Sequence, residues 1–300
     1  MFQQLGLIGC GLMGGSFALA LKKAGWVQHV VGYSKSPSTT AHALQMGVID
    51  ATAASAAEAA AGSDLVLLAL PVGATEATLQ AILPTITPRT LIMDVGSTKG
   101  DVVQAARRAL GPLLANFVPA HPNTGKEVAG VAHADAHLYR GAKVILTPTD
   151  LTLPSHLHNA EALWRALECE VHVMPPATHD AAFAAVSHLP HMLAFAMMQS
   201  LSHQAQCDAF LQIAGPGFRD FTRIAAGEPT MWRDILLANQ TEVLAQAQHF
   251  RQALQAFEEA LRAGDAQALE AMIAAASSAR ARCRFSPAPH ATPAATAAAA

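Results

Sequence analysis

Three glycines near the N-terminus have the spacing of a loop that binds phosphate groups. Gly9, Gly11 and Gly14 follow the apolar residues 5–8 and precede an alanine- and leucine-rich segment. Between a strand and a helix, the first glycine permits a tight turn, the second lets a pyrophosphate approach the backbone, and the third allows close packing. We expect a dinucleotide site at residues 9–14, which include Leu12 and Met13. A glycine-rich turn that only closes a loop is the alternative.

Histidines are the next residues that could do chemistry. His121 precedes a proline at the end of a predicted strand, and neutral imidazole accepts a proton near physiological pH. From the residues alone, however, a hydrogen-bonded structural histidine is the favoured interpretation of His121. His188 and His191 stand three residues apart on one predicted helix face, with Pro190 between them. A metal-binding pair is one interpretation of these two, and a structural role is favoured over it.

Apolar runs define the elements that must position these residues. Residues 5–8 are predicted to form a buried strand and residues 17–24 a helix, with Gly25 as its C-terminal glycine. The runs "HVVGYS", "DLVLLALPV" and "TLIMDVGS" are typical of buried strands, and helical segments separate them. This alternation predicts a parallel, doubly wound sheet. The later runs "FVPAH", "KVILTPT" and "VHVMP" are predicted to extend that sheet to about residue 175.

The pattern changes at Thr178, after which long helical periodicity is found and almost no strand signal. We therefore predict an α/β Rossmann-type dinucleotide-binding domain at residues 1–175, followed by an all-α domain at residues 176–285. Residues 286–300 are a Pro- and Ala-rich stretch that is expected to be a disordered tail. Helices this apolar are hard to bury within a small domain, so we expect the all-α domain to form a homodimer.

Composition narrows the function classes. The chain is 52% hydrophobic and 14% charged with a formal net charge of −3, which disfavours a disordered chain and an electrostatic nucleic-acid binder. A small-molecule substrate fits better. The four cysteines show no metal-like spacing and are expected to be reduced thiols of a cytoplasmic protein. Apolar runs are too short or too interrupted to cross a bilayer, so no membrane is expected.

The end of the second predicted strand bears on the choice of dinucleotide. An acidic residue at this place binds the adenosine ribose in the NAD-type pattern. Here the sequence reads Gly32-Tyr33-Ser34-Lys35, with no carboxylate. A hydroxyl and an ammonium can bind a 2′-phosphate instead. We therefore expect Ser34 and Lys35 to favour NADP, with NAD possible, and an ordinary solvated turn is the alternative.

Four further motifs follow the glycine pattern in a fixed order. They are "DVGSTKG" at 94–100, "HPNTGKEVAG" at 121–130, "SHLPHMLAF" at 187–195 and "GFRDFTRIAAGEPTMWRDILLAN" at 217–239. In this order they resemble the prephenate and arogenate dehydrogenases of tyrosine biosynthesis, from about residue 5 to about residue 260. The resemblance implies an oxidative decarboxylation, in which a cyclohexadienol loses hydride to nicotinamide and releases carbon dioxide as the ring becomes aromatic.

The resemblance also implies roles for individual residues. His121 matches the catalytic histidine, and Ser97 matches a serine that hydrogen-bonds the same substrate hydroxyl, although a helix N-cap is a second role for Ser97. Arg223 matches the arginine that grips a substrate carboxylate. The other residues that match family positions lie in or near the substrate pocket; they are His188, His191, Glu127, Asp220 and Trp232. No metal is implied.

Two other functions compete with this interpretation. A 3-hydroxyacid-type dehydrogenase also has a glycine-rich start and a helical second half, but it would want a lysine base on the first long helix, and no lysine follows Lys143. A non-catalytic NADP-binding dimeric sensor would keep the glycines without needing His121, Ser97 and Arg223 together. Within the dehydrogenase family, the motifs leave both prephenate and arogenate open as substrates.

Overall fold

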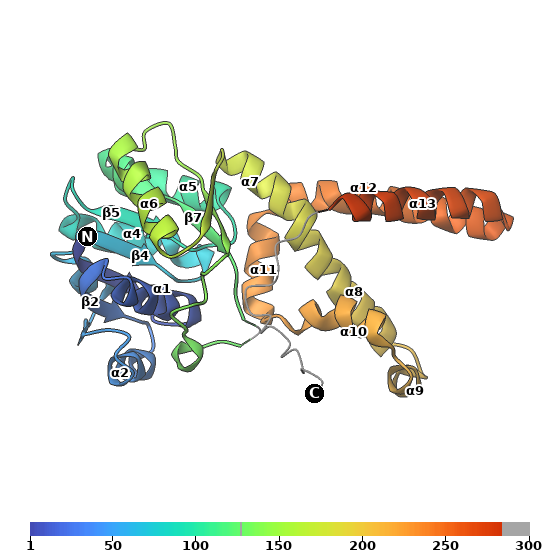
Figure 1. The fold of residues 1–300 in the computed structure, drawn as a ribbon, viewed down its shortest axis with the longest axis horizontal. Coiled ribbons are helices and arrows are strands. Elements are labelled where there is room, and N and C mark those ends of the chain that lie inside the picture. Colours follow the sequence, from blue (N-terminus) through green and yellow to red (C-terminus); the bar gives the residue numbers. More distant parts are fainter. Residues whose placement is uncertain (127, 284–300) are drawn as a thin grey trace, which may run out of the picture. The chain divides into compact units, whose positions relative to one another are not determined.

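A parallel sheet forms the centre of the N-terminal half in this computed structural model, which describes residues 1–126 and 128–283 (Figure 1). Its strand order is β3-β2-β1-β4-β5-β6, with crossovers on both sides of β1. This order confirms the predicted doubly wound topology. The strands are β1 Phe2–Ile8, β2 Val27–Tyr33, β3 Ala51–Thr52, β4 Leu65–Leu68, β5 Leu91–Asp94 and β6 Phe117–Val118.

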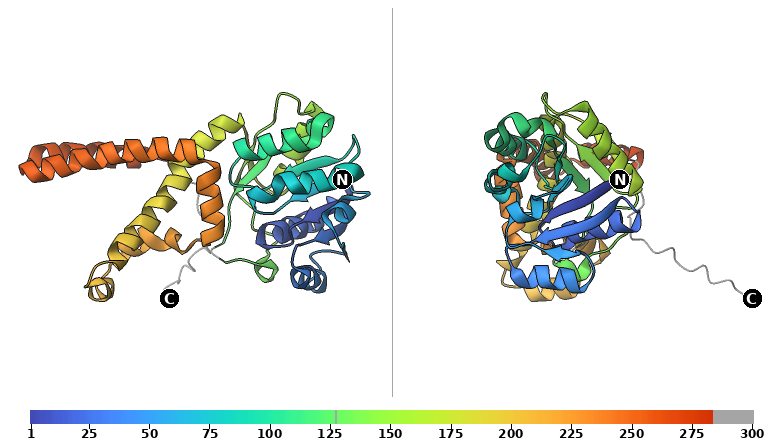
Figure 2. Two further views of the ribbon diagram at one scale, coloured as in Figure 1. Left: turned by 180° about the vertical axis from the view of Figure 1, so that it is seen from behind. Right: turned by 90° about the vertical axis from the view of Figure 1, so that its left-hand side faces the viewer.

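Helices cover both faces of this sheet, as the turned views show (Figure 2). Alternate residues of a strand point to opposite faces, and in β4 Leu65 and Leu67 belong to one core cluster while Val66 and Leu68 belong to the other. Because both faces are buried, the strand reads as an unbroken apolar run. The helices are α1 Leu12–Lys23, α2 Pro37–Gln45, α3 Ala56–Ala60, α4 Thr75–Ile82, α5 Gly100–Leu110 and α6 Pro154–Ala166.

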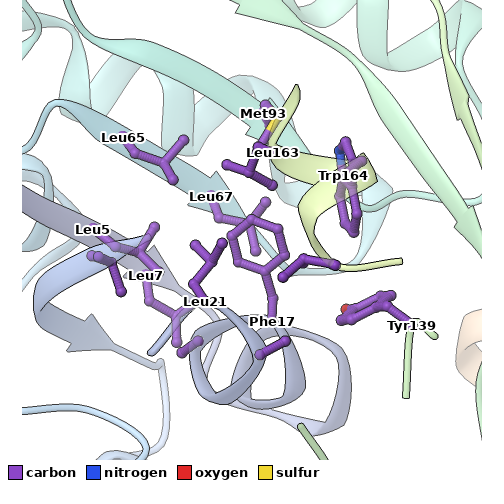
Figure 3. Packing of buried hydrophobic residues seen from close by; sticks show 14 of the residues in the cluster. Leu5, Leu7, Phe17, Leu21, Leu65, Leu67, Met93, Tyr139, Leu163 and Trp164 are labelled. Carbon is purple, nitrogen blue, oxygen red and sulfur yellow. The ribbon is translucent and has the colours of Figure 1, made fainter. Parts of the chain in front are cut away.

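One core cluster holds the glycine loop and α1 against the sheet (Figure 3). Phe17 of α1 contacts Trp164 of α6 with ring centroids 5.0 Å apart, and both side chains are fully buried. Tyr139 packs edge-on against Phe17 and donates a hydrogen bond to the Met13 carbonyl at 2.7 Å. Burying each such side chain stabilises the fold by roughly 1.5–3 kcal/mol. The beginning of α1 is therefore rigidly placed.

The prediction of a single sheet reaching residue 175 is wrong. The run "FVPAH" divides at Pro119, and the chain then starts a separate sheet of order β7-β8-β9 in which β7 is antiparallel to β8. Proline has no amide hydrogen for the first sheet's ladder, and its carbonyl instead accepts a hydrogen bond from Thr147 N at 2.9 Å. The second sheet comprises β7 Ala120–Asn123, β8 Lys143–Leu146 and β9 Glu170–Val173.

A long helical stretch follows the second sheet. It runs as α7 Pro176–Phe183, a π-helical turn at Ala184–His188, and α8 Leu189–Ser202. The prediction that all apolar runs are too short or too interrupted to cross a bilayer is wrong for this stretch, whose length and mean hydropathy of 1.4 would suffice. Its side chains His179 and Asp180, however, hydrogen-bond to residues of the sheet domain. Three further helices complete this part: α9 Cys207–Gln212, α10 Pro216–Thr222 and α11 Pro229–Ala238, with a 3₁₀ turn at Arg223–Ala226.

The chain divides into two compact units, Met1–Val243 and a second that begins at Leu244. The second unit consists of α12 Gln240–Ala263 from Leu244 onward and α13 Ala266–Arg282, which run side by side (Figures 1 and 2). Gly264, with φ of 63°, turns the chain between them, and Asp265 caps α13 through Ala268 N at 2.9 Å. The predicted tail at residues 286–300 lies outside the described residues.

Candidate active site

The glycine loop has the three features that its spacing predicts. Gly9 has φ of 104°, and a Cβ there would lie 2.0 Å from the Ala69 carbonyl oxygen. A Cβ on Gly14 would lie 2.0 Å from the Gly9 carbonyl oxygen, whereas a Cβ on Gly11 would meet nothing within 4 Å. Helix α1 begins at Leu12 with no side-chain cap and no acidic residue in its first turn. Its amide groups therefore remain suited to an anionic ligand such as a pyrophosphate.

Two alanine substitutions should separate the roles of these glycines. Gly14→Ala forces a backbone overlap and should lower the stability by about 1–3 kcal/mol, which is several degrees of Tm. The added methyl group of Gly11→Ala meets no protein atom within 4 Å, but it fills the space in front of the α1 amides. We expect it to leave Tm unchanged and to weaken dinucleotide binding by about tenfold or more. Thermal unfolding and dinucleotide titration of both variants check this; equal effects of the two substitutions on Tm would contradict it.

Ser34 lies beside the glycine loop, at the end of β2. Its Oγ accepts a hydrogen bond from Cys10 N at 2.8 Å, and the neighbouring Tyr33 carbonyl accepts one from Gly9 N at 2.8 Å. A hydroxyl that accepts one hydrogen bond keeps its proton for another partner. Lys35 follows on the exposed side. The structure thus brings Ser34 next to the predicted phosphate-binding backbone.

His121 is buried on β7 and hydrogen-bonded to a second histidine. Its Nδ1 lies 2.8 Å from His179 Nε2, and His179 Nδ1 lies 2.8 Å from Asp180 Oδ1. Phe183 packs on both rings, each with centroids 4.4 Å away. Sequence reasoning missed His179 and Asp180, which stand 58 and more residues from His121. The only signal for them was a histidine and an aspartate side by side in the first turns of a predicted helix.

Asp180 also holds the start of α5. Its two carboxylate oxygens accept hydrogen bonds from Lys99 N at 2.9 Å and Gly100 N at 2.7 Å. Lys99 is the N-cap residue of α5 and provides no side-chain cap. The helix is thus capped by Asp180 of α7, and the alternative role of Ser97 as its N-cap is wrong. Ser97 is half-buried in the loop that leads from β5 to this cap.

A buried ion pair joins this loop to β7. Lys99 Nζ donates to Asp94 Oδ2 and, at 2.8 Å, to the Ala120 carbonyl, while Asp94 Oδ1 accepts from Ala120 N at 3.0 Å. Both side chains are almost fully buried, so the close pairing and the additional hydrogen bonds offset the cost of removing them from water. The pair fixes the carboxyl end of β5 against the residue that precedes His121.

Burial and neighbouring groups lower the pKa values of the buried histidines, which favours their neutral form. Burial is the main cause that lowers the pKa of His121 well below its usual value, and His179, Lys99 and His188 lower it further. Burial also lowers the pKa of His179, and it lowers the pKa of His188 to about 4. A neutral imidazole has a free nitrogen lone pair at physiological pH, which a general base needs, while burial makes it a weaker base than a solvated histidine.

His188, His191, Trp232 and Arg223 gather on the helical side. His188 is buried, and its Nδ1 lies 3.1 Å from Asn239 Nδ2. The His191 ring stacks on Trp232 with centroids 3.7 Å apart, and its Nδ1 donates to the Ser187 carbonyl at 2.9 Å. Burial lowers the pKa of His191, the Ser187 bond raises it, and the nearby charge of Arg223 lowers it. This set includes the predicted site residues that follow the sheet domain, with the exception of Asp220.

Two predicted site residues lie outside this group. Asp220 lies on the exposed surface of α10 and pairs with Arg219 at 3.7 Å, so the structure does not bring it to the histidines. Glu127 lies outside the described residues. In α10, Pro216 occupies the first turn, where its missing amide hydrogen costs the helix no hydrogen bond.

The parallel sheet and the glycine loop before α1 define a protein of the dinucleotide-binding class. Comparison with known proteins gives the family. Residues 17–173 match "Prephenate dehydrogenase, nucleotide-binding domain", and residues 175–275 match "Prephenate dehydrogenase, dimerization domain". The chain belongs to the prephenate dehydrogenase family, which confirms the resemblance of its motifs.

Individual relatives agree with this assignment. The chain is 37% identical to the prephenate dehydrogenase of Bacillus subtilis over 79% of this chain and 64% of that enzyme. It is 31% identical to the cyclohexadienyl dehydrogenase of Zymomonas mobilis over 83% of this chain and 85% of that enzyme. A solved structure of Aquifex aeolicus prephenate dehydrogenase with hydroxyphenyl propionate and NAD⁺ superposes with a TM-score of 0.87 at 34% identity, covering 94% of this chain and 98% of that one.

Proposed function

We propose that the protein catalyses the oxidative decarboxylation of prephenate, arogenate or both, with hydride transfer to a nicotinamide dinucleotide. The observation that carries this proposal is the buried neutral His121, which is tied through Ala120 to the carboxyl end of β5, where doubly wound sheets bind their ligands. The names of the relatives supply the substrate class. The reaction needs a base, and a neutral His121 can supply it.

Each group of site residues has a separate role in the proposed reaction. The backbone of residues 9–14 fits a dinucleotide pyrophosphate, because Gly11 leaves open space there and the α1 amides are uncapped. The bound dinucleotide supplies the acceptor for the hydride that leaves ring carbon 4. His121 accepts the proton of the 4-hydroxyl, and Ser97 hydrogen-bonds that hydroxyl. The bond to the ring carboxylate breaks, carbon dioxide leaves, and the electron pair of that bond completes the aromatic ring.

A direct assay tests this function. The purified protein is mixed with prephenate or with arogenate and with NADP or NAD, and the near-ultraviolet absorbance of the reduced nicotinamide is followed. We expect reduction with at least one substrate, together with release of carbon dioxide and a phenolic product. A protein that binds dinucleotide but reduces none with either substrate would contradict the proposal and would favour the non-catalytic sensor.

We also propose that NADP is the preferred dinucleotide, since Ser34 and Lys35 provide a hydroxyl and an ammonium where a carboxylate would repel a 2′-phosphate. Ser34→Asp should weaken NADP binding by about tenfold or more and leave NAD binding within about threefold. Titration of both dinucleotides against both proteins checks this. Tighter binding of NAD than of NADP by the unchanged protein would contradict it.

The assembly and location are further proposals. We propose a cytoplasmic homodimer with its domains at residues 1–175 and 176–285. The two family matches meet between residues 173 and 175, and the second is described as a dimerization domain. Support for a dimer comes also from large apolar side chains exposed on the helices, among them Val186, Ile213 and Leu237, at 71%, 83% and 62% exposure. All four cysteines are free thiols, as suits a reducing compartment.

A further inference from the structure

The hydrogen bonds of Asp180 determine where the protons lie on His179 and His121. An ionised carboxylate only accepts hydrogen bonds, so His179 Nδ1, at 2.8 Å from Asp180 Oδ1, must carry a hydrogen. In a neutral imidazole the other nitrogen is then an acceptor. His179 Nε2 therefore accepts from His121 Nδ1 at 2.8 Å, which leaves the lone pair of His121 on Nε2.

We propose that Asp180 and His179 are positioning residues that hold His121 in the tautomer whose Nε2 accepts the substrate proton. This inference rests on the proposed function for the identity of the substrate, but not for the tautomer itself. The same carboxylate caps α5 through Lys99 N and Gly100 N, and this cap ends the loop that carries Ser97. One side chain of α7 thus fixes both residues that are expected to meet the 4-hydroxyl.

Asp180 is itself held from two directions. Burial opposes its ionisation, but hydrogen bonds from His179 and from the amides of Lys99 and Gly100 keep its pKa below the usual value. Asn239, buried at the end of α11, donates from Nδ2 to the Asp180 carbonyl at 2.8 Å and reaches His188 Nδ1 with the same amide group. The Asn239 bond fixes the backbone of Asp180, and the bonds from His179, Lys99 N and Gly100 N fix its carboxylate, so the carboxylate has little freedom to rotate.

The hydrogen-bonded series His121–His179–Asp180 also balances charge during the reaction. When His121 takes a proton it becomes a cation in a buried site, where the groups that face it are Lys99, His179 and His188. None of these three is an anion, and Asp94 is engaged with Lys99. Asp180, acting through His179, is the carboxylate that stabilises the new cation. A neutral His179 does not repel this cation and accepts the hydrogen bond from His121 Nδ1, so breaking the His121–His179–Asp180 series should make His121 a weaker base as well as a less ordered one.

Two substitutions of His179 separate this role from simple packing. His179→Phe keeps an aromatic ring beside Phe183 but removes the acceptor for His121 Nδ1. We expect kcat to fall on the order of 10- to 100-fold with KM nearly unchanged, and the acidic limb of the kcat/KM profile to move to lower pH. His179→Gln offers an amide oxygen near the place of Nε2, so it should recover most of kcat while the acidic limb stays shifted. His172→Phe, a half-exposed histidine on β9, is the matched control.

A spectroscopic measurement makes the test independent of turnover. Nitrogen-15 chemical shifts of labelled histidine, assigned by comparison with the His121→Asn protein, should show His121 protonated on Nδ1 in the unchanged protein and a mixture of tautomers after His179→Phe. Protonation of His121 on Nε2 in the unchanged protein would overturn the proposal. So would a folded His179→Phe protein with unchanged kcat and pH profile. Absence of turnover by the unchanged protein would instead remove the proposed function and leave the tautomer measurable.

Discussion

Replacing His121 with asparagine is expected to lower turnover by at least about a hundredfold, the effect of losing a general base, while dinucleotide affinity stays unchanged. Asparagine is close in size to imidazole and its amide can still hydrogen-bond His179, so the fold should survive. Its amide nitrogen, however, cannot take up a proton at physiological pH. Single-turnover kinetics and dinucleotide titration measure the two quantities separately.

The pH dependence of the unchanged enzyme should also show that a neutral His121 is required. The base works only while His121 is neutral, so kcat/KM should fall as the pH drops and His121 becomes protonated. Burial holds its pKa well below the usual value, which places this fall below about pH 6.5. His158→Asn, an exposed histidine on α6, is the control and should behave like the unchanged protein. Near-normal turnover of His121→Asn would remove His121 from the mechanism.

Replacing Arg223 with alanine is expected to raise KM for the substrate by about 30-fold, which corresponds to about 2 kcal/mol, with dinucleotide affinity unchanged. The guanidinium is close enough to His191 to lower the pKa of that ring, so it lies on the helical side of the histidine cluster. A planar donor fork at this place suits a substrate carboxylate. Since the same contact exists before and during the reaction, the loss should appear mainly in KM.

Two further variants sharpen this prediction. Arg223→Lys keeps the positive charge but not the paired donors, so its KM should lie between those of the unchanged protein and of Arg223→Ala. Arg233→Ala removes an exposed arginine of α11 that pairs with Asp234 and should leave KM unchanged. An unaltered KM for Arg223→Ala, measured at saturating dinucleotide, would mean that another cation binds the carboxylate.

Local sequence patterns were enough to predict much of this fold. Strand and helix periodicity predicted the parallel doubly wound sheet and the helical region after residue 175, because a strand buried on both faces must be apolar throughout. The spacing of the three glycines predicted the tight turn, the open backbone and the close packing, since a left-handed φ and a missing Cβ are properties of single residues. The helix α1 nevertheless begins at Leu12, earlier than the predicted residue 17, because Gly14 packs against the loop as part of the helix.

By itself the sequence determined the glycine loop, the order of the elements and, through its motifs, the family. Only the tertiary structure decided that Pro119 ends the first sheet and that β7 belongs to a second one. It alone joined His121 to His179 and Asp180, and Asp180 to the start of α5, across separations of 58 to 81 residues. No periodicity records such contacts, because hydrogen bonds between side chains on different elements depend on how those elements pack, and packing sums many weak contacts over the whole domain.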